Sequence, residues 1–374
     1  MASKTYGTAA RRWEGMGPYY AMFPTRFADE VVRRYTRPGD AVLDPFAGRG
    51  TAVFSAAHQG RSGYGVEICP VGWVYASTKL QPATESRVLA RLQDLVRLGP
   101  KYAPVADTLP EFFEWCFAPD VRSFLVAARE ELNWRNSRVD RTLMAFLLIY
   151  MHGKRGAALS NQMRQTKAMA PKYAIRWWQD RDLKPPNVDV LPFMTKRIRW
   201  RHAKGMPEVP MAQAYLGGSE NVLPRIRPII QDRHPEGVKL LLTSPPYFGV
   251  TNYHYDQWVR LWLLGGPATD SRVSGRHKLQ AKFEHPERYA EMLRKVFGMC
   301  SAFLKTGAII YVRTGAQDST LTPTVDALRS AFPSSTLVQE ARPYAHPTQT
   351  QLFGATKGSG GEVDILVRAQ MQGH

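Results

Sequence analysis

Cysteine is scarce in this chain: 374 residues contain only Cys69, Cys116 and Cys300. The three are far apart, odd in number and without Cys-x-x-Cys spacing. A disulfide framework and a cysteine-based zinc site are therefore both disfavoured. The histidines are also too scattered for the spacing of metal ligands, so we expect no metal site.

Long apolar runs are also missing. No stretch approaches the roughly 20 residues that a membrane-spanning helix needs, so we expect no membrane association. The first residues, MASKTYGTAARRWEG, lack the apolar centre of a signal peptide. Hydrophobic residues make up 44% and charged residues 22% of the chain, which excludes wholesale disorder. We expect a soluble, reduced, cytoplasmic protein.

Acidic residues are few compared with basic ones: 32 Asp and Glu against 50 Lys and Arg, for a net charge of +18. This surplus favours a polyanionic partner, with nucleic acid the leading class, and says nothing about the fold. The segment from Lys154 to Lys204 alone has a net charge of +10. The alternative interpretation is a basic, well-solvated surface without a partner.

The pattern of elements predicts an α/β protein. A short apolar strand at 41–44, a Gly-rich turn, a helix from Thr51 and a second strand at 63–68 form a βαβ unit. Five further strands are expected at 212–216, 238–243, 308–313, 336–341 and 362–368, with helices at 25–35, 286–304 and 322–332. The result is a seven-stranded sheet interrupted by a mostly helical, basic insertion. We expect residues 1–82 and 209–374 to form the two parts of a catalytic domain, and 83–208 to form the insertion.

The turn after the first strand has the composition of a cofactor-binding loop. It reads Asp44-Pro-Phe-Ala-Gly-Arg-Gly-Thr51 and lies where open α/β sheets bind ligands. It lacks the third glycine of the dinucleotide fingerprint, so a pyrophosphate site is disfavoured. An acid at its start suits a cofactor with a cationic end, such as S-adenosylmethionine, whose amino group Asp44 can hold directly or through water. Glu67, at the end of the second strand, is placed to accept the ribose hydroxyls.

A second loop, Thr243-Ser244-Pro245-Pro246-Tyr247, follows an apolar strand directly. Consecutive prolines fix an extended backbone and leave carbonyl oxygens free as acceptors. The Ser244 hydroxyl adds another acceptor, and Tyr247 offers a flat ring on which a base can stack. Such an array suits the exocyclic amine of a nucleobase. When two acceptors bind its N–H groups, the nitrogen lone pair is directed at a methyl group. The alternative is a proline-rich turn with a buried tyrosine.

These two loops together resemble those of the S-adenosylmethionine-dependent DNA amino-methyltransferases, of the N4-cytosine and N6-adenine type. The resemblance covers about residues 20–80 and 210–370. It implies a Rossmann-like seven-stranded methyltransferase sheet, a flipped target base and direct methyl transfer. The implied catalytic residues are Ser244, Pro245, Pro246 and Tyr247. The implied cofactor-binding residues are Phe23, Asp44, Phe46, Gly48, Gly50, Thr51, Glu67 and Thr243. Of these, Phe23 matches only weakly. The segment 216–219, Leu-Gly-Gly-Ser, departs from the family, which often has an acidic residue there.

The first residue of the catalytic loop favours one base. Within the family, Ser-Pro-Pro-Tyr is typical of N4-cytosine enzymes, and Asp- or Asn-Pro-Pro-Tyr of N6-adenine enzymes. Methylation at carbon 5 needs a cysteine nucleophile, which this loop lacks. We therefore expect a DNA methyltransferase that forms N4-methylcytosine in double-stranded DNA, with N6-adenine as the alternative. An RNA guanine-N2 methyltransferase is disfavoured because its loop usually begins with Asp. A non-catalytic nucleic-acid-binding module is disfavoured by the intact Gly48, Gly50 and Glu67.

The basic insertion is the expected target-recognition region. The residues expected to bind DNA are Arg164, Lys167, Lys172, Arg176, Lys196, Arg197, Arg199 and Arg201. For Trp177 and Trp178, core packing is slightly favoured over contact with bases. The resemblance is also compatible with association with the nucleoid and with a cognate restriction endonuclease as partner.

Overall fold

We describe a computed structural model of the chain at residues 7–18, 24–209, 211–249, 253–270, 285–343 and 361–369. The chain forms two compact units, which we call the sheet unit and the helical unit. The sheet unit consists of Tyr19–Ala76, Val209–Asn252 and Gly275–His374. The helical unit consists of Met1–Pro18, Ser77–Glu208 and Tyr253–Ser274.

The sheet unit contains one seven-stranded sheet in the order β3-β2-β1-β4-β5-β7-β6. Its strands are β1 (Ala41–Asp44), β2 (Ser62–Glu67), β3 (Ala212–Leu216), β4 (Val238–Thr243), β5 (Leu304–Gly315), β6 (Thr336–Pro343) and β7 (Gly361–Arg368). The first five strands pair in parallel, whereas β7 runs antiparallel to both β5 and β6. The expected Rossmann-like seven-stranded sheet is thus confirmed.

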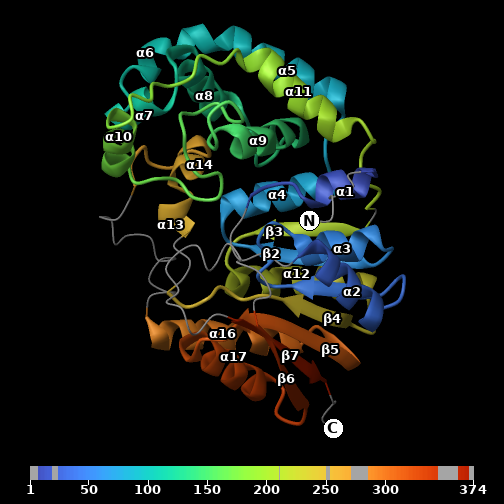
Figure 1. Cartoon of the computed structure of the whole chain (residues 1–374). Coiled ribbons are helices and arrows are strands. Elements are labelled where there is room, and N and C mark those ends of the chain that lie inside the picture. Colours follow the sequence, from blue (N-terminus) through green and yellow to red (C-terminus); the bar gives the residue numbers. More distant parts are fainter. Residues whose placement is uncertain are drawn as a thin grey trace. The chain divides into compact units, whose positions relative to one another are not determined.

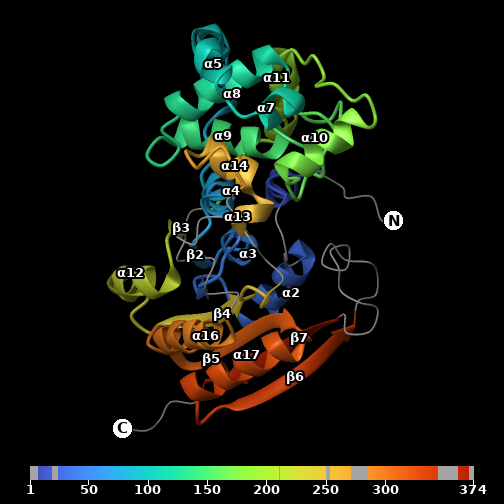
Figure 2. The same ribbon diagram turned by 90° about the vertical axis from the view of Figure 1, so that its left-hand side faces the viewer.

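Helices cover both faces of this sheet. The helices of the unit are α2 (Thr25–Tyr35), α3 (Thr51–His58), the first part of α4 (Pro70–Leu80), α12 (Ser219–Arg233), α16 (Pro286–Ser301) and α17 (Asp318–Ala331). On one face, Ala28, Val31 and Val32 of α2 pack with α3 and with alternate residues of β4. Their spacing of three and four residues places them on one side of the helix. On the other face, α16 and α17 lie together along β5–β7 (Figure 2).

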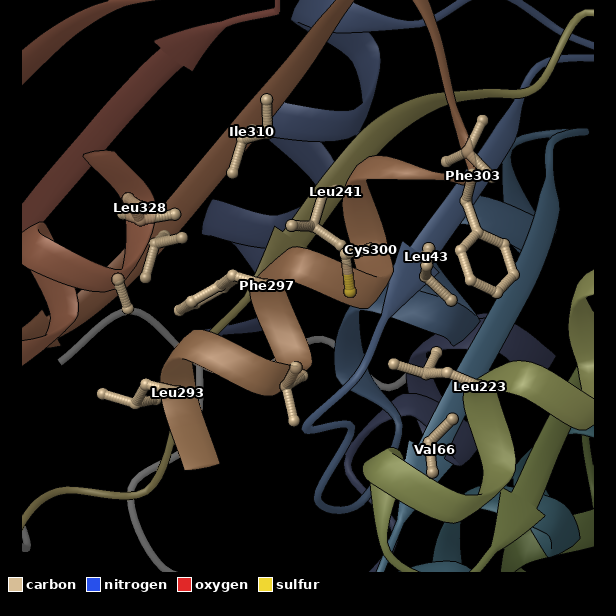
Figure 3. Packing of buried hydrophobic residues seen from close by; sticks show 14 of the residues in the cluster. Leu43, Val66, Leu223, Leu241, Leu293, Phe297, Cys300, Phe303, Ile310 and Leu328 are labelled. Carbon is tan, nitrogen blue, oxygen red and sulfur yellow. The ribbon is translucent and has the colours of Figure 1, made fainter. Parts of the chain in front are cut away.

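The larger core lies between the sheet and α12, α16 and α17. Phe297 and Cys300 of α16 belong to this core together with Leu241 of β4, and Leu223 of α12 lies near Val66 of β2 (Figure 3). All five side chains are buried. Because alternate residues of a strand face opposite sides of a sheet, Leu241 belongs to this core while Leu240 and Leu242 belong to the opposite one.

The helical unit is built around buried helices. Its elements are α1 (Ala9–Glu14), the end of α4, α5 (Glu85–Leu98), η1 (Gly99–Tyr102), α6 (Ala103–Ala106), α7 (Glu111–Cys116), α8 (Pro119–Glu131), α9 (Arg138–Tyr150), α10 (Pro171–Gln179), α11 (Val190–His202), α13 (Tyr253–Asp256) and α14 (Trp258–Leu263). Helices α5 and α11 run side by side (Figure 1). Trp13 of α1 is buried, with its ring edge-on to both Phe146 and His202.

The structure differs from the expected boundaries in several places. Helix α16 ends at Ser301, and β5 begins at Leu304, where the helix was expected to end. Helix α17 begins at Asp318 rather than at 322. Residues 1–18, 77–82 and 253–274 belong to the helical unit, although we expected them in the catalytic domain. The last segment joins because its aromatic residues, Trp258 and Trp262, pack on Phe113 of α7.

No helix in the described ranges is both long enough and apolar enough to cross a membrane.

Candidate active site

The two loops singled out in the sequence begin at the same edge of the sheet. Strands β1 and β4 are parallel neighbours, with Leu43 paired to Leu241. Asp44 ends β1 and Thr243 ends β4, and the Thr243 hydroxyl donates a hydrogen bond of 2.6 Å to Asp44 Oδ1. Both residues are buried. The loop that starts with Pro45 and the loop that starts with Ser244 therefore leave the sheet together.

The first loop is tight and depends on its glycines. The Gly50 N–H donates to the Ala47 carbonyl over 2.7 Å, and Gly48 and Gly50 have φ angles of 54° and 74°. Residues with a Cβ rarely adopt this left-handed region. At Gly50 there is also no room, because a Cβ would lie 2.8 Å from the Cβ of Ala76. Helix α3 starts directly afterwards, at the buried Thr51.

Glu67 holds this loop from the neighbouring strand. Its Oε2 accepts the Gly48 N–H over 2.6 Å, and its Oε1 accepts the Cys69 N–H over 2.7 Å. The residue as a whole is 6% exposed. Glu67 therefore lies at the end of β2 as expected and contacts the glycine turn itself.

The segment that departs from the family pattern also reaches this loop. The Ser219 hydroxyl, at the start of α12, donates to the Pro45 carbonyl, and the Gly217 N–H donates to the Glu67 carbonyl over 2.9 Å. The Gly217 backbone and the Ser219 side chain therefore support the turn from the segment 216–219, which itself contains no acidic residue.

Burial changes the acidity of Asp44. Its side chain is 2% exposed, and removal from water raises its pKa from 3.8 to about 7, although the Thr243 hydroxyl and the Phe46 N–H oppose the shift. Burial thus favours the neutral form of this carboxyl group more than in a solvent-exposed aspartate. A nearby cation would favour its charged form.

The second loop is mostly buried. Ser244 is partly exposed, whereas Pro245, Pro246 and Tyr247 are buried. The Pro246 carbonyl, which we expected to be a free acceptor, accepts a 2.9 Å hydrogen bond from the Tyr289 hydroxyl. Burial raises the pKa of Tyr289, so this hydroxyl stays protonated and acts as the donor.

Tyr247 is a packed wall of the site rather than an exposed platform. Only 4% of the residue is accessible, and its hydroxyl donates to Glu362 Oε1 over 3.0 Å. A Cβ at Gly315 would lie 3.4 Å from Tyr247 Cδ2, so the ring lies against the backbone of β5. Stacking of a base on this ring stays a prediction.

Tyr247 is connected through Glu362 to a network of charged residues. Arg313 makes two hydrogen bonds to Asp364, of 2.7 and 2.8 Å, and its Nε lies 3.7 Å from Glu362 Oε2. Burial disfavours the charged form of Arg313, but the hydrogen bonds and charge of Asp364 outweigh this and raise its pKa. Burial also raises the pKa of Glu362, against the opposing effect of Arg313. The Arg313 guanidinium lies 3.6 Å from the centre of the Phe27 ring.

The sequence analysis did not identify the residues that hold the second loop. Glu362, Tyr289 and Gly315 carry no motif and are 42 residues or more from Tyr247 in the chain. Tyr289 reaches the loop from α16, and the pairing of β5 with β7 brings Glu362 opposite Gly315. The only sign of this role in the sequence is a polar residue, Glu362, at the start of the last strand.

Two expected cofactor residues need separate comment. Phe23 lies outside the described residues. Phe46 is partly buried, and its ring lies edge-on to Phe297 with 6.3 Å between centroids, so part of its role is core packing.

The residues expected to bind DNA differ widely in exposure. Those that are exposed are Arg164, Lys172, Arg176, Lys196 and Arg199. Lys167 is partly buried and paired with Asp256 at 2.7 Å. Arg197 is partly buried, with its guanidinium 3.3 Å from the centre of the Phe193 ring. Arg201 is 6% exposed and donates to the Arg12 carbonyl, so it belongs to the interior of the helical unit rather than to a surface set.

The two tryptophans of α10 have different environments. Trp178 is fully buried and donates a 2.7 Å hydrogen bond to the Gln162 carbonyl, as the core interpretation requires. Trp177 is partly exposed, and the Arg181 guanidinium lies 4.5 Å from its ring centre.

Comparisons with known proteins point in one direction. Residues 3–71 match the sequence pattern of a family described as DNA methylase. The chain is 28% identical over 82 residues to the type II methyltransferase M.MjaII of Methanocaldococcus jannaschii, covering 22% of this chain and 16% of that protein. It is 37% identical over 65 residues to the type II methyltransferase M.Cfr9I of Citrobacter freundii, covering 17% of this chain and 22% of that protein.

A solved structure, the rRNA methyltransferase AviRa of Streptomyces viridochromogenes, is 15% identical and aligns with 94% of this chain and 87% of its own, with a TM-score of 0.31. The matched regions span less than a quarter of the curated relatives' length. Over that part of the sequence, the resemblance to the DNA amino-methyltransferases is confirmed.

Proposed function

We propose that this protein is an S-adenosylmethionine-dependent DNA methyltransferase that modifies the N4 amino group of cytosine. The observation that carries the proposal is the 2.6 Å hydrogen bond between Thr243 and Asp44, which joins the start of both loops at one edge of the sheet. The similarity of residues 3–71 to a DNA methylase family supports the same reaction class.

The residues around the first loop fit the cofactor. Asp44 places a buried carboxyl group beneath the loop, where its charge attracts the cationic methionine end. Glu67 accepts two backbone N–H groups and is placed to exchange one of them for a ribose hydroxyl. The left-handed Gly48 and Gly50 let a ligand approach the backbone closely. When bound, S-adenosylmethionine supplies a methyl group on a sulfonium centre.

The second loop would position the amine. We assign Ser244, whose side chain is partly exposed, and the carbonyl of Pro245 as the two acceptors for the amino hydrogens. The conjugated amine of cytosine is a poor nucleophile, and two acceptors favour a pyramidal nitrogen whose lone pair faces the methyl group. The nitrogen then loses one proton to solvent. Tyr289, Glu362 and Gly315 keep this loop in place.

The choice of cytosine rests on Ser244. A neutral hydroxyl at this position is typical of the N4-cytosine enzymes in the family that the loop resembles. Adenine N6 is the alternative product. A base in a duplex is inaccessible to such a site, so the proposal includes extrusion of the target base.

The exposed cations of the helical unit are proposed to bind DNA. Lys172, Arg176, Lys196 and Arg199 are exposed, and phosphate neutralisation requires accessible cations of this kind. The type II methyltransferase relatives also support a cognate restriction endonuclease as a proposed partner.

One experiment tests the base and the substrate. The protein is incubated with methyl-labelled S-adenosylmethionine and either double-stranded DNA or RNA, and the digested nucleosides are identified by mass. We expect label in N4-methylcytosine from DNA. N6-methyladenine would overturn the choice of base, and label in RNA alone would overturn the substrate class. Ser244→Ala serves as the control and should abolish most of the label.

A further inference from the structure

The helical unit contains a cavity that the proposed reaction does not use. Its volume is about 700 Å³, within the range of small-molecule sites. It is lined by Gln162, Met163, Arg164, Lys167, Ala168, Met169, Ala170, Tyr173, Trp177 and Tyr255. These residues come from the loop between α9 and α10, from α10 and from α13, and they include none of the residues of the two loops described above.

The loop that forms most of the wall is irregular but well supported. Residues 151–170 contain isolated β-bridges and no regular element. Loops of this length are uncommon in compact proteins unless they are functional. Side chains bind the backbone of this loop: Trp258 Nε1 donates to the Met169 carbonyl over 3.1 Å, and Gln257 Nε2 donates to the Thr166 carbonyl over 3.1 Å.

A buried arginine completes this support. Arg260 is fully buried and donates to the Leu148 carbonyl over 2.6 Å and to the Gln165 carbonyl. His152 Nδ1 lies 3.1 Å from the Arg164 carbonyl, and burial, together with Arg260, lowers the pKa of His152 well below its usual value. The neutral imidazole is therefore the donor in this bond. These hydrogen bonds hold the cavity wall from within the helical unit.

The lining has the chemistry of a nucleotide site. Three aromatic residues, Tyr173, Trp177 and Tyr255, provide flat apolar surfaces. Arg164 provides positive charge, whereas the charge of Lys167 is paired with Asp256. The ten lining residues in the described part of the chain include no carboxylate. Tyr173 is 61% exposed at the rim, and Lys167 Nζ lies 5.2 Å from the centre of the Tyr255 ring. Aromatic rings beside cations are the means by which proteins bind unpaired bases and their phosphates.

Resting on the proposed function, we infer that this cavity binds one unpaired nucleotide of the DNA, at a place separate from the methylated base. The base stacks on the aromatic wall, and its phosphate lies at the exposed Arg164. Extrusion of a target base leaves other nucleotides without a partner, so DNA in this reaction can supply such a ligand.

Photo-crosslinking locates the bound base. A duplex with a single bulged 5-iododeoxyuridine is irradiated with the whole protein in the absence of cofactor, and the crosslinked peptide is identified by mass. We expect the crosslink at Tyr173, Trp177 or Tyr255. A crosslink confined to residues 244–249 would overturn the inference, because the bulged base would then occupy the proposed catalytic site. Preferential crosslinking of a bulged RNA would overturn the choice of DNA.

Binding measurements with matched variants test the residues. We expect the wild-type protein to bind the bulged duplex about tenfold more tightly than the fully paired duplex, as one stacked base can supply. Tyr173→Ala and Arg164→Ala should bring this ratio close to one. Arg176→Ala is the control: it is an exposed cation on α10 that does not line the cavity, so it should weaken both complexes and keep the ratio.

The contrary outcomes are distinct. Equal binding of both duplexes by the wild-type protein, or equal effects of Arg164→Ala and Arg176→Ala, would contradict the inference. Tight binding of free deoxynucleoside monophosphate without a preference for the bulge would show a free nucleotide as the ligand instead. Methyl transfer is measured on the same samples and tests the proposed function separately. The protein can prefer the bulged duplex without methylating DNA, and it can methylate DNA without preferring the bulged duplex.

Discussion

At the residue scale, the most direct prediction concerns Asp44, the acidic residue at the start of the first loop. Asp44 has a pKa raised to about 7 by burial, whereas a cationic cofactor favours the charged carboxylate. Below pH 7 the group is increasingly neutral, so binding of S-adenosylmethionine must expel its proton. We expect cofactor affinity to be about tenfold weaker at pH 6 than at pH 8, measured by calorimetry.

The matched control for this prediction is Asp44→Asn. The amide oxygen can still accept from Thr243 and from the Phe46 N–H, but the group no longer titrates. The variant should bind weakly across this pH range and lack the tenfold change. If it shows the same pH dependence as the wild type, another group is responsible.

Ser244 and Glu67 should separate chemistry from cofactor binding. Ser244→Ala removes an amine acceptor and should lower the methylation rate by about a hundredfold, with a change in cofactor Kd below about threefold. Glu67→Ala removes the acceptor of two loop N–H groups and should weaken cofactor binding by at least about tenfold. Single-turnover kinetics and calorimetry report the two effects. Equal effects of both substitutions on both quantities would contradict the assigned roles.

At the scale of elements, the position of the Ser-Pro-Pro-Tyr loop depends on strand β7. Glu362 accepts the Tyr247 hydroxyl, and Asp364, two residues later on the same face, holds Arg313. Glu362→Ala should lower kcat by about ten- to a hundredfold and leave cofactor affinity unchanged, because small displacements of reacting groups are costly. Arg313 keeps its two hydrogen bonds to Asp364, so the variant should remain folded.

Glu362→Gln is the conservative partner of that variant. Its amide oxygen can still accept from Tyr247, so most of kcat should return. A loss of thermal stability in both variants, without this rescue, would mean that Glu362 has only a structural role.

The elements near the two loops could be predicted because their signals are local. Strands β1, β3 and β4 have the expected bounds, since each is a short apolar run that ends at a loop rich in Pro or Gly. The position of β7 between β5 and β6 could not be predicted, because strand order depends on contacts between distant residues. For the same reason the roles of Glu362 and Gly315 were hidden, while those of Gly48 and Gly50 could be inferred from their own turn.

At the scale of the whole molecule, the basic residues behind the net charge of +18 are not equally accessible to a partner. Lys196 and Arg199 of α11 are exposed, whereas Arg201 on the same helix is buried against Arg12. Replacing Lys196 and Arg199 together with Ala should weaken DNA binding and reduce the slope of log K against log salt by up to about two. Titrations at several salt concentrations measure this slope.

Arg201→Ala is the contrasting variant. It leaves the Arg12 carbonyl without this buried donor and should cost about 1–3 kcal/mol of stability, seen as a lower Tm. Its effect on the salt slope should be small. An unchanged slope in the Lys196/Arg199 double variant would exclude this face of α11 from the DNA contact.

The helical unit is assembled from three separate stretches of sequence, and the chain crosses between the units five times. One stretch, which contains Trp258 and Arg260, follows the Ser-Pro-Pro-Tyr loop within a few residues. A single crossover point in the sequence therefore cannot exchange the whole helical unit for another one. Such an exchange requires coordinated replacement of all three stretches.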